Sequence, residues 1–263
     1  MSHLKSLLAS VAMVSALGIG ALGATTLPAF AAAPECAADA SLATRVDAAL
    51  ARTDRPAEQR ERDEFRRPEV EFLLSHVKPG DHVLDLGAGG GYASMLLSSA
   101  VCDGVVDSQN PELWDVKFKE MPAREALAAA RSNIHLLQAD FDKLPVPTPL
   151  YDVAFAGMIY HDTYNFDGHD AGKLLAGLKA VLKPGGLVVL TDHNTAPGVG
   201  AGATNTLHRI EKQTVLDDFK AAGFVLVEDN GVLANTTDDH SKIVFDPSVR
   251  GHTDRFALVF KKP

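Results

Sequence analysis

Charged residues are almost absent from the N-terminal end of this sequence. Lys5 is the only Lys, Arg, Asp or Glu among the first 34 residues, and an apolar stretch runs from Leu7 to about Leu22. Small residues follow it and end in Ala29-Phe30-Ala31. A positive start, an apolar middle and an A-x-A end predict a secretory signal peptide cleaved after Ala31. An uncleaved membrane anchor is the alternative, because the apolar stretch is long.

Two further export patterns are missing. No pair of arginines precedes the apolar stretch, and Cys36 follows Ala33-Pro34-Glu35 rather than the apolar and small residues of a lipid-attachment site. We therefore expect a periplasmic or secreted protein with no stable membrane anchor once the signal peptide is removed. Cysteine is scarce: only Cys36 and Cys102 are present, and an oxidising compartment would allow them to pair. Sequence alone leaves open whether they form a disulfide or stay as two thiols.

An excess of basic residues is also missing. The chain has 25 Lys and Arg against 34 Asp and Glu, a formal charge of −9 that becomes −10 without Lys5. This balance argues against a nucleic-acid partner, which requires a basic face. It favours small partners that are neutral or cationic, although the sequence does not define the oligomeric state. The hydrophobic content of 46% is sufficient for a real core.

The order of apolar and polar segments predicts three regions and an α/β fold. Residues 1–31 are the signal peptide, and residues 32–67 form a partly helical extension whose charged part, 54–67, reads as an exposed helix. Pro68 suits the first turn of the next helix and begins the main domain, 68–263. Strands and helices then alternate, which predicts a doubly wound, mostly parallel sheet of seven strands. The expected strands are 82–86, 105–108, 134–139, 151–156, 187–191, 224–228 and 256–260.

The G-x-G-x-x-G fingerprint of dinucleotide-binding proteins is absent. Residues 83–92 read VLDLGAGGGY, so a third glycine in that spacing would fall on Tyr92 or Ser94. Instead the strand ends at Asp85 and passes through Gly87, Gly89 and Gly91 into a helix. Glycine allows a tight turn with positive φ and lets a ligand lie against bare backbone. The helix start adds unpaired N–H groups beside that ligand.

The D-x-G-x-G-x-G form resembles motif I of the class I S-adenosylmethionine (SAM) methyltransferases. That resemblance implies SAM as the cofactor, a seven-stranded Rossmann-like sheet with an antiparallel last strand, and a glycine turn under the methionine part of the cofactor. The site residues it implies are Asp85, Gly87, Ala88, Gly89 and Gly91. In the segment HLLQADFDKLP it implies that Asp140 accepts from the adenine amino group and that Phe141 packs on the ring.

The second strand departs from the family pattern. The resemblance implies an acid at the end of this strand for the ribose hydroxyls, and the sequence there is GVVDSQNPELW. In a short strand Asp107 fills that role, whereas in a longer register Gln109 or Asn110 does so through a neutral amide. We favour Asn110, because Pro111 closes the strand after it.

Histidines and acids follow the fourth and fifth expected strands. Ligands of open α/β sheets lie beyond the carboxyl ends of the strands, so this placement indicates a functional edge. His is the natural base near neutral pH, which makes His161 the first candidate and His193 the second. Tyr160 and Asp162 are pocket walls or orienting groups. Asp162 is not expected to orient His161, because neighbours on an extended chain point to opposite sides.

A divalent metal site is the competing interpretation of the same edge. His161, His193 and His208, with Asp192 as a further candidate, carry imidazole and carboxylate groups that suit zinc and similar ions.

Longer segments are similar to a group of secreted or periplasmic methyltransferases of uncharacterised substrate. They are YHDTYN (160–165), LKPGGLVVLTDHNTAPG (182–198), LHRIE (207–211) and DPSVRGHTDRF (246–256). The sequence therefore predicts a SAM-dependent methyltransferase acting on an unknown small-molecule or envelope acceptor outside the cytoplasm. SAM is made in the cytosol, so the alternative is a ligand- or metal-binding protein that keeps this fold without methyl transfer.

Overall fold

The computed structural model describes residues 40–263. The predicted signal peptide, its cleavage site and Cys36 lie outside the described residues. Cys102 is not a free thiol, but its pairing with Cys36 stays a prediction. No helix among the described residues has both the length and the apolar character needed to cross a membrane.

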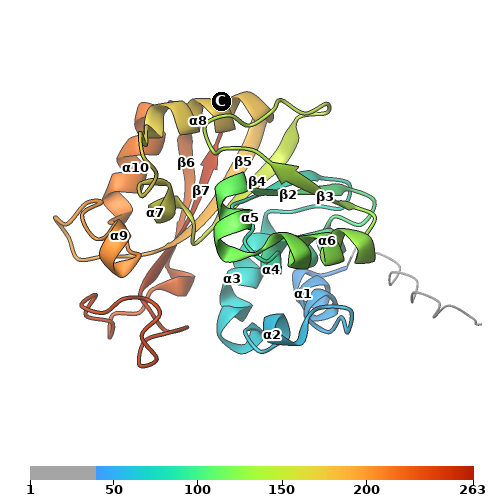
Figure 1. The fold of residues 1–263 in the computed structure, drawn as a ribbon, viewed down its shortest axis with the longest axis horizontal. Helices are drawn as coiled ribbons and strands as arrows, with labels where there is room; N and C mark the ends of the chain where they lie inside the picture. The colour runs from blue at the N-terminus through green and yellow to red at the C-terminus, as the bar shows by residue number, and fades with distance from the viewer. Residues whose placement is uncertain (1–39) are drawn as a thin grey trace, which may run out of the picture. The chain divides into compact units, whose positions relative to one another are not determined.

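A single sheet of seven strands forms the centre of the fold (Figure 1). Its order is β3-β2-β1-β4-β5-β7-β6, and β7 runs antiparallel to both β5 and β6 while the other pairs are parallel. This confirms the expected mostly parallel sheet with a reversed last strand. The strands are β1 His82–Leu86, β2 Val105–Asn110, β3 Ile134–Gln138, β4 Tyr151–Gly157, β5 Leu182–His193, β6 Val225–Asn230 and β7 Arg255–Lys261.

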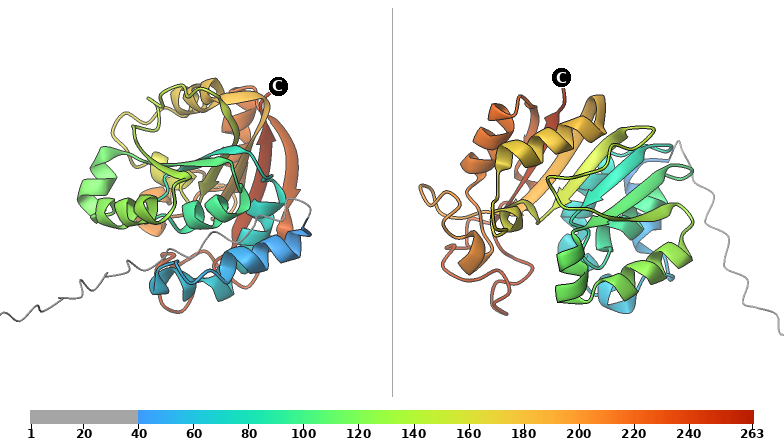
Figure 2. Two further views of the ribbon diagram at one scale, coloured as in Figure 1. Left: turned by 90° about the vertical axis from the view of Figure 1, so that its right-hand side faces the viewer. Right: turned by 45° about the horizontal axis from the view of Figure 1, so that its top comes forward.

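Helices cover both faces of the sheet, because its strands point apolar side chains to each face and both faces must be buried. One core packs α1 Leu42–Leu50, α3 Asp63–Ser75 and α4 Tyr92–Ala100 against one face, and the other core packs α8 Ala171–Val181 and α10 Lys212–Ala221 against the opposite face. Figure 2 shows these layers from two further directions. The remaining helices are α2 Ala57–Arg60, α5 Glu112–Phe118, α6 Met121–Ala130, α7 Tyr160–Thr163, α9 Thr204–Leu207 and the 3₁₀ turn η1 Gly231–Leu233.

The N-terminal helices differ from the sequence prediction. Pro68 lies inside α3 rather than at the start of a new helix, so the expected boundary between residues 67 and 68 falls within one element. Proline removes one hydrogen bond from a helix, but the buried side chains of Val70, Leu73 and Leu74 hold α3 against the sheet. The charged segment is not fully exposed either, because Arg55 is buried and pairs with Asp63 at 2.7 Å.

The long polar segment 231–254 is held by a buried ion pair. The Arg209 guanidinium donates to both carboxylate oxygens of Asp238, at 2.8 and 3.2 Å, and also to the carbonyl oxygens of Asn194 and Lys242. Asp238 in turn accepts from the backbone N–H of Asp254 at 2.7 Å. This one arginine therefore ties the segment to the carboxyl end of β5.

We predict that Arg209→Met destabilises the fold strongly. It leaves the Asp238 carboxylate buried without its partner, and breaking a buried pair in this way costs about 3–5 kcal/mol. Lys212→Met is the matched control, since it removes an exposed pair with Asp229 and should cost less than about 1 kcal/mol. Urea unfolding of both variants measures the difference, and equal losses would show that the buried pair does not hold the segment.

Candidate active site at the carboxyl edge of the sheet

The glycine turn after β1 is fastened to the end of β2. The Gly87 N–H donates to Gln109 Oε1 at 2.9 Å, and the Ala88 N–H donates to the Gln109 carbonyl at 2.8 Å. The Gly89 N–H donates to Asn110 Oδ1 at 3.0 Å. Two side chains from a neighbouring strand therefore fix the path of the turn.

The three glycines with positive φ meet different surroundings. A Cβ on Gly87 (φ 65°) would lie 2.3 Å from Ile159 Cγ1, and one on Gly91 (φ 80°) would lie 2.1 Å from Leu127 Cδ1. A Cβ on Gly89 (φ 54°) would meet nothing within 4 Å. Neighbouring side chains therefore leave no room for a Cβ at Gly87 or Gly91, whereas the Gly89 backbone borders open space that a ligand could fill.

Asp85 lies beneath this turn. Its side chain is buried, and its carboxylate accepts a 2.5 Å hydrogen bond from Ser94 Oγ at the start of α4. Burial raises the pKa of Asp85 to about 6, while the bond from Ser94 acts in the opposite direction. At neutral pH it is a buried carboxylate without an ion-pair partner in the described residues, and such a group attracts a cationic ligand group.

The amide favoured for a ribose contact, Asn110, and its alternative, Gln109, are already engaged in hydrogen bonds. Asn110 Nδ2 donates to the Gly89 carbonyl at 3.3 Å and to Asp115 Oδ1 at 2.9 Å, and Gln109 Nε2 donates to the Ala139 carbonyl at 2.6 Å. Arg124, which is fully buried, pairs with Asp115 at 2.5 Å behind them. The end of β2 is therefore a supporting network for the turn.

Asp107 lies away from the glycine turn. It accepts from Tyr151 Oη at 2.6 Å and from His82 Nε2 at 3.2 Å, and these two residues begin β4 and β1. Its carboxylate thus lies toward the amino ends of the strands. The structure does not bring Asp107 together with the other predicted cofactor residues.

Asp140 and Phe141 line a cavity of about 220 Å³ between the end of β3 and the segment after α7. Phe141 is buried and packs edge-on against Trp114 and Phe166, with ring centroids 5.4 and 5.6 Å apart. Asp140 is half exposed and pairs with Lys143 at 2.7 Å. His169 also lines the cavity, and its Nε2 is buried without a hydrogen-bond partner in the described residues. The cavity therefore offers an aromatic surface, an accessible carboxylate and an unused polar nitrogen.

Two histidines and two aspartates come together from α7, the end of β5 and the residue after α9. Asp192 Oδ1 lies 2.6 Å from His161 Nδ1, and Asp192 Oδ2 accepts the His161 backbone N–H at 2.8 Å. On the other side of the ring, Asp162 Oδ1 lies 3.3 Å from His161 Nε2 and 3.2 Å from His208 Nδ1. We call Asp192, His161, Asp162 and His208 the histidine cluster. Ile159, two residues before His161, packs on Gly87, so this cluster adjoins the glycine turn.

The electrostatics of the histidine cluster differ from the sequence expectation. Burial lowers the pKa of His161, but the carboxylates of Asp192 and Asp162 outweigh it and raise that pKa to about 10. Burial raises the pKa of Asp162, whereas hydrogen bonds from His161 and His208 hold it well below its usual range. His161 is therefore an imidazolium at neutral pH, and the assumption of an ordinary histidine pKa was wrong for it.

The expected relation of Asp162 to His161 was also wrong. Residues 160–163 form the helical turn α7 instead of an extended chain, so adjacent side chains can converge. Tyr160 lies elsewhere: its hydroxyl donates to Asp218 on α10 at 2.9 Å, and the ring is buried. Tyr160 therefore supports α10 and presents no free hydroxyl to the edge.

His193 does not belong to the group of side chains whose ligand atoms lie close enough to bind one metal ion. Its Nδ1 lies 2.8 Å from Thr253 Oγ1, and burial followed by the nearby His161 charge lowers its pKa well below the usual value. Among the described residues, the group with suitably close ligand atoms is His161, Asp162 and His208, all within 4.8 Å of one another. Asp162 thus replaces His193 in the metal set expected from the sequence. Asp192, the second-last residue of β5, was foreseen as a ligand but not as the partner of His161.

Comparisons with known proteins agree with this architecture. Residues 83–186 match the family described as "Methyltransferase domain". A SAM-dependent methyltransferase from Aquifex aeolicus superposes with a TM-score of 0.56 at 18% identity, covering 85% of this chain and 100% of that one. The fold is that of the class I methyltransferases.

Other solved structures show how widely this fold is used. The N-methyltransferase NodS from Bradyrhizobium japonicum WM9 has a TM-score of 0.51 at 14% identity, covering 78% of this chain and 96% of that one. The [4+2]-cyclase SpnF has a TM-score of 0.54 at 19% identity, covering 79% and 81%. At these identities the likeness shows the fold alone, so the reaction has to be argued from the site.

The raised pKa of His161 predicts a pH-dependent stability. The folded protein keeps this proton up to about pH 10, whereas the unfolded chain loses it near 6.5, so the unfolding free energy falls as pH rises through that window. One such group gives a slope of at most about 1.4 kcal/mol per pH unit.

Chemical unfolding at pH 7, 8 and 9 measures this slope. His161→Gln should lose it, and the exposed-histidine variant His135→Gln should keep it. A wild-type slope that survives in His161→Gln would show that another group carries the titration.

Proposed function

We propose that this protein is a SAM-dependent methyltransferase. The observation that carries the proposal is the glycine turn after β1, with open space at Gly89. In the same sheet, the segment after β3 lines the Phe141 cavity, and the segments after β4 and at the end of β5 contribute to the histidine cluster. The match of residues 83–186 to a methyltransferase domain supports the same conclusion.

The residues present fit SAM. Gly89 leaves room for a ligand against the backbone, and the buried carboxylate of Asp85 favours a cationic group there. The cavity beside Phe141 offers an aromatic surface for a flat ring, with Asp140 and the unpartnered His169 Nε2 as polar contacts. When bound, SAM supplies a methyl group already activated by its sulfonium.

The protein's main task is then to hold an acceptor in line with that methyl group, and positioning can supply several kcal/mol. A base is needed only where the acceptor loses a proton. His161 is already protonated and donates to Asp192 and Asp162, so it serves as the anchor of the cluster. We infer that His208 is the base. Its Nδ1 lies 3.2 Å from both Asp162 Oδ1 and His161 Nε2, and in the tautomer whose Nδ1–H points toward Asp162, Nε2 is the proton acceptor.

A metal site is the second candidate function. The nitrogen and carboxylate atoms of His161, Asp162 and His208 lie close enough to bind one divalent ion together. Such a protein could use the class I fold without methyl transfer, and the cyclase among the solved structures is named for a different reaction. Neutral imidazoles are required in that case, because a metal ligand must be deprotonated.

We further propose that the protein acts outside the cytoplasm, like the secreted or periplasmic group that its sequence resembles. The apolar stretch after Lys5 and the A-x-A end at Ala31 support export. N-terminal sequencing of protein from the cell envelope or medium should begin near Ala32, whereas full-length chain in the cytosol would contradict the proposal. Export would require that SAM or a related ligand reach the same compartment.

Gly89→Val tests the cofactor site. The added side chain fills the open space over the turn, so we predict a loss of SAM affinity of more than tenfold, or about 1.4 kcal/mol, by calorimetry. Gly198→Val is the control, because Gly198 also has positive φ (84°) and open space but lies after β5, in the loop before α9. It should carry comparable backbone strain and bind SAM like the wild type. Wild-type affinity in Gly89→Val would refute the assignment.

Substitutions in the histidine cluster distinguish the methyltransferase proposal from the metal-site alternative. Under the methyltransferase proposal, His208→Gln loses turnover and keeps SAM affinity, and a chelator changes neither. Asp192→Asn should weaken the anchoring of His161 and shift the pH profile of the reaction. Under the metal alternative, elemental analysis finds about one ion per chain, and His161→Gln, Asp162→Asn and His208→Gln each lower it. Full turnover without metal in His208→Gln would remove His208 from the proposed chemistry.

A further inference from the structure

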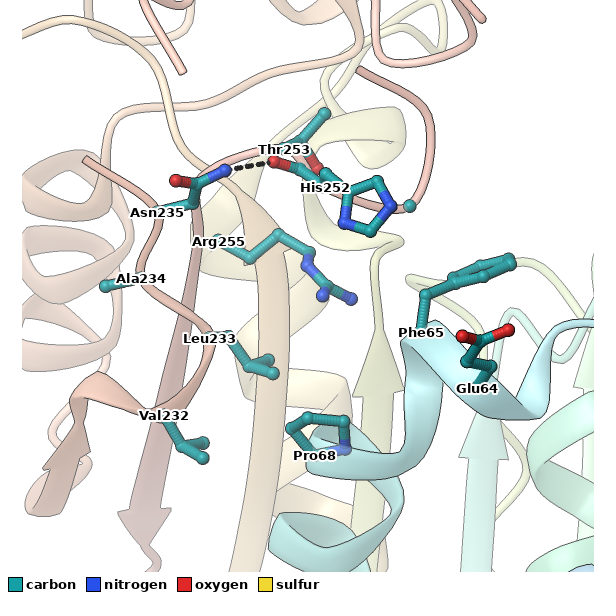
Figure 3. A pocket seen from close by; sticks show the side chains of 11 residues that line it. Glu64, Phe65, Pro68, Val232, Leu233, Ala234, Asn235, His252, Thr253 and Arg255 are labelled. Carbon is teal, nitrogen blue, oxygen red and sulfur yellow. Dashed lines mark hydrogen bonds between the residues drawn. The ribbon is translucent and has the colours of Figure 1, made fainter. Parts of the chain in front are cut away.

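A second cavity, of about 280 Å³, lies between α3 and the chain around the start of β7 (Figure 3). Its walls come from three separate parts of the sequence: the first half of α3, the η1 turn with the residues after it, and residues 251–255. Phe65, Pro68 and Leu233 give it apolar surface, and Glu64 lies at an exposed position. The cavity approaches the lower end of the usual range for small-molecule sites, about 300 Å³.

Arg255 lines this cavity, and its charged group has no hydrogen-bonded or ion-pair partner among the described residues. Its side chain is only 8% exposed, and Figure 3 shows the guanidinium reaching into the space between β7 and α3. Within residues 40–263 its guanidinium forms no hydrogen bond or ion pair, and the Nε atom is buried without a partner. A buried charge without a partner is costly, so a fold keeps one where something compensates it.

The other buried arginines of the described chain show that this is an exception. Each of them pairs with a carboxylate: Arg55 with Asp63, Arg124 with Asp115, Arg131 with Asp54 and Arg209 with Asp238. Arg255 alone has none. Glu69 is near enough to act on its charge, but both carboxylate oxygens of Glu69 are taken, one by Arg66 and one by Thr191 Oγ1.

We propose that this cavity binds a small molecule with a carboxylate attached to an apolar body. The Arg255 guanidinium presents a planar fork that matches a carboxylate with two parallel hydrogen bonds. The rings of Phe65 and Pro68 and the side chain of Leu233 contact the apolar part. The exposed Glu64 is screened by solvent and does not replace the missing anion.

The cavity adjoins the histidine cluster through His193. Arg255 is the register partner of His193 in the antiparallel pairing of β5 and β7. Thr253, which lines the cavity, bonds to His193, whose ring centroid lies 6.1 Å from that of His161. Taking the carboxylate ligand to be the methyl acceptor rests on the proposed function, whereas its binding to Arg255 does not.

Binding of benzoate and phenylacetate to the full chain tests this inference. Each should raise the melting temperature of the wild-type protein in a saturable way, because a ligand that binds only the folded state stabilises it. Benzamide has nearly the same shape without the charge and should give a much smaller shift. Equal shifts with benzoate and benzamide, or no shift with either carboxylate, would overturn the proposal.

Two arginine variants identify the residue. Arg255→Met should abolish the benzoate and phenylacetate shifts and leave the unliganded melting temperature unchanged or higher, because it removes an unpaired buried charge. Arg250→Met removes an exposed charge nearby and should keep the shifts. A strong fall in the unliganded melting temperature of Arg255→Met, or shifts that survive in it, would return Arg255 to a structural role.

The same variants keep this proposal separate from the cofactor assignment. Arg255→Met should bind SAM with wild-type affinity, and Gly89→Val should keep the benzoate shift. Loss of SAM binding in Gly89→Val with an intact benzoate shift would support both sites. An intact benzoate shift in a wild-type protein that binds no SAM would overturn the proposed function and leave the carboxylate site standing.

Discussion

The hold of β2 on the glycine turn is the interaction on which the candidate site depends. The side-chain oxygens of Gln109 and Asn110 accept the backbone N–H groups of Gly87 and Gly89. Asn110 Nδ2 in turn donates to Asp115, which forms a buried ion pair with Arg124. These hydrogen bonds lie within the protein, so they hold the turn in its path without a ligand. The same path leaves the open space over Gly89 and lets Ile159 pack on Gly87, which brings the histidine cluster beside the turn.

The buried charged side chains of the described residues fall into two groups, those with an ion-pair partner and those without one. Arg55, Arg124, Arg131 and Arg209 are neutralised by carboxylates and hold segments together. Asp85 and Arg255 are buried at the same edge of the sheet without an ion-pair partner in the described residues. One is negative and lies under the glycine turn, and the other is positive and lies at the start of β7. Together they make the edge suited to a cationic cofactor on one side and an anionic molecule on the other.

The sequence predicted the sheet well and the site less well. The bounds of β1, His82–Leu86, follow from local patterns of apolar residues and turns, and the reversed last strand was implied by the family resemblance. The partners of polar side chains come from segments far apart in the chain, which local patterns do not encode. Asp107 therefore turned out to face His82 and Tyr151, and the largest upward effect on the pKa of His161 comes from Asp192, 31 residues away. Nothing in the sequence indicates that Arg255 is unusual, because only the structure shows that it is buried without an ion-pair partner among the described residues.

A crystal structure of the protein with S-adenosylhomocysteine would test the central claim most directly. The account predicts that the adenine ring occupies the cavity beside Phe141 and Asp140 and that the amino acid part lies over Gly89, with the β2 hydrogen bonds to the turn unchanged. A ligand bound elsewhere, or a glycine turn that stays bare at saturating ligand while the histidine cluster holds a metal ion, would contradict it.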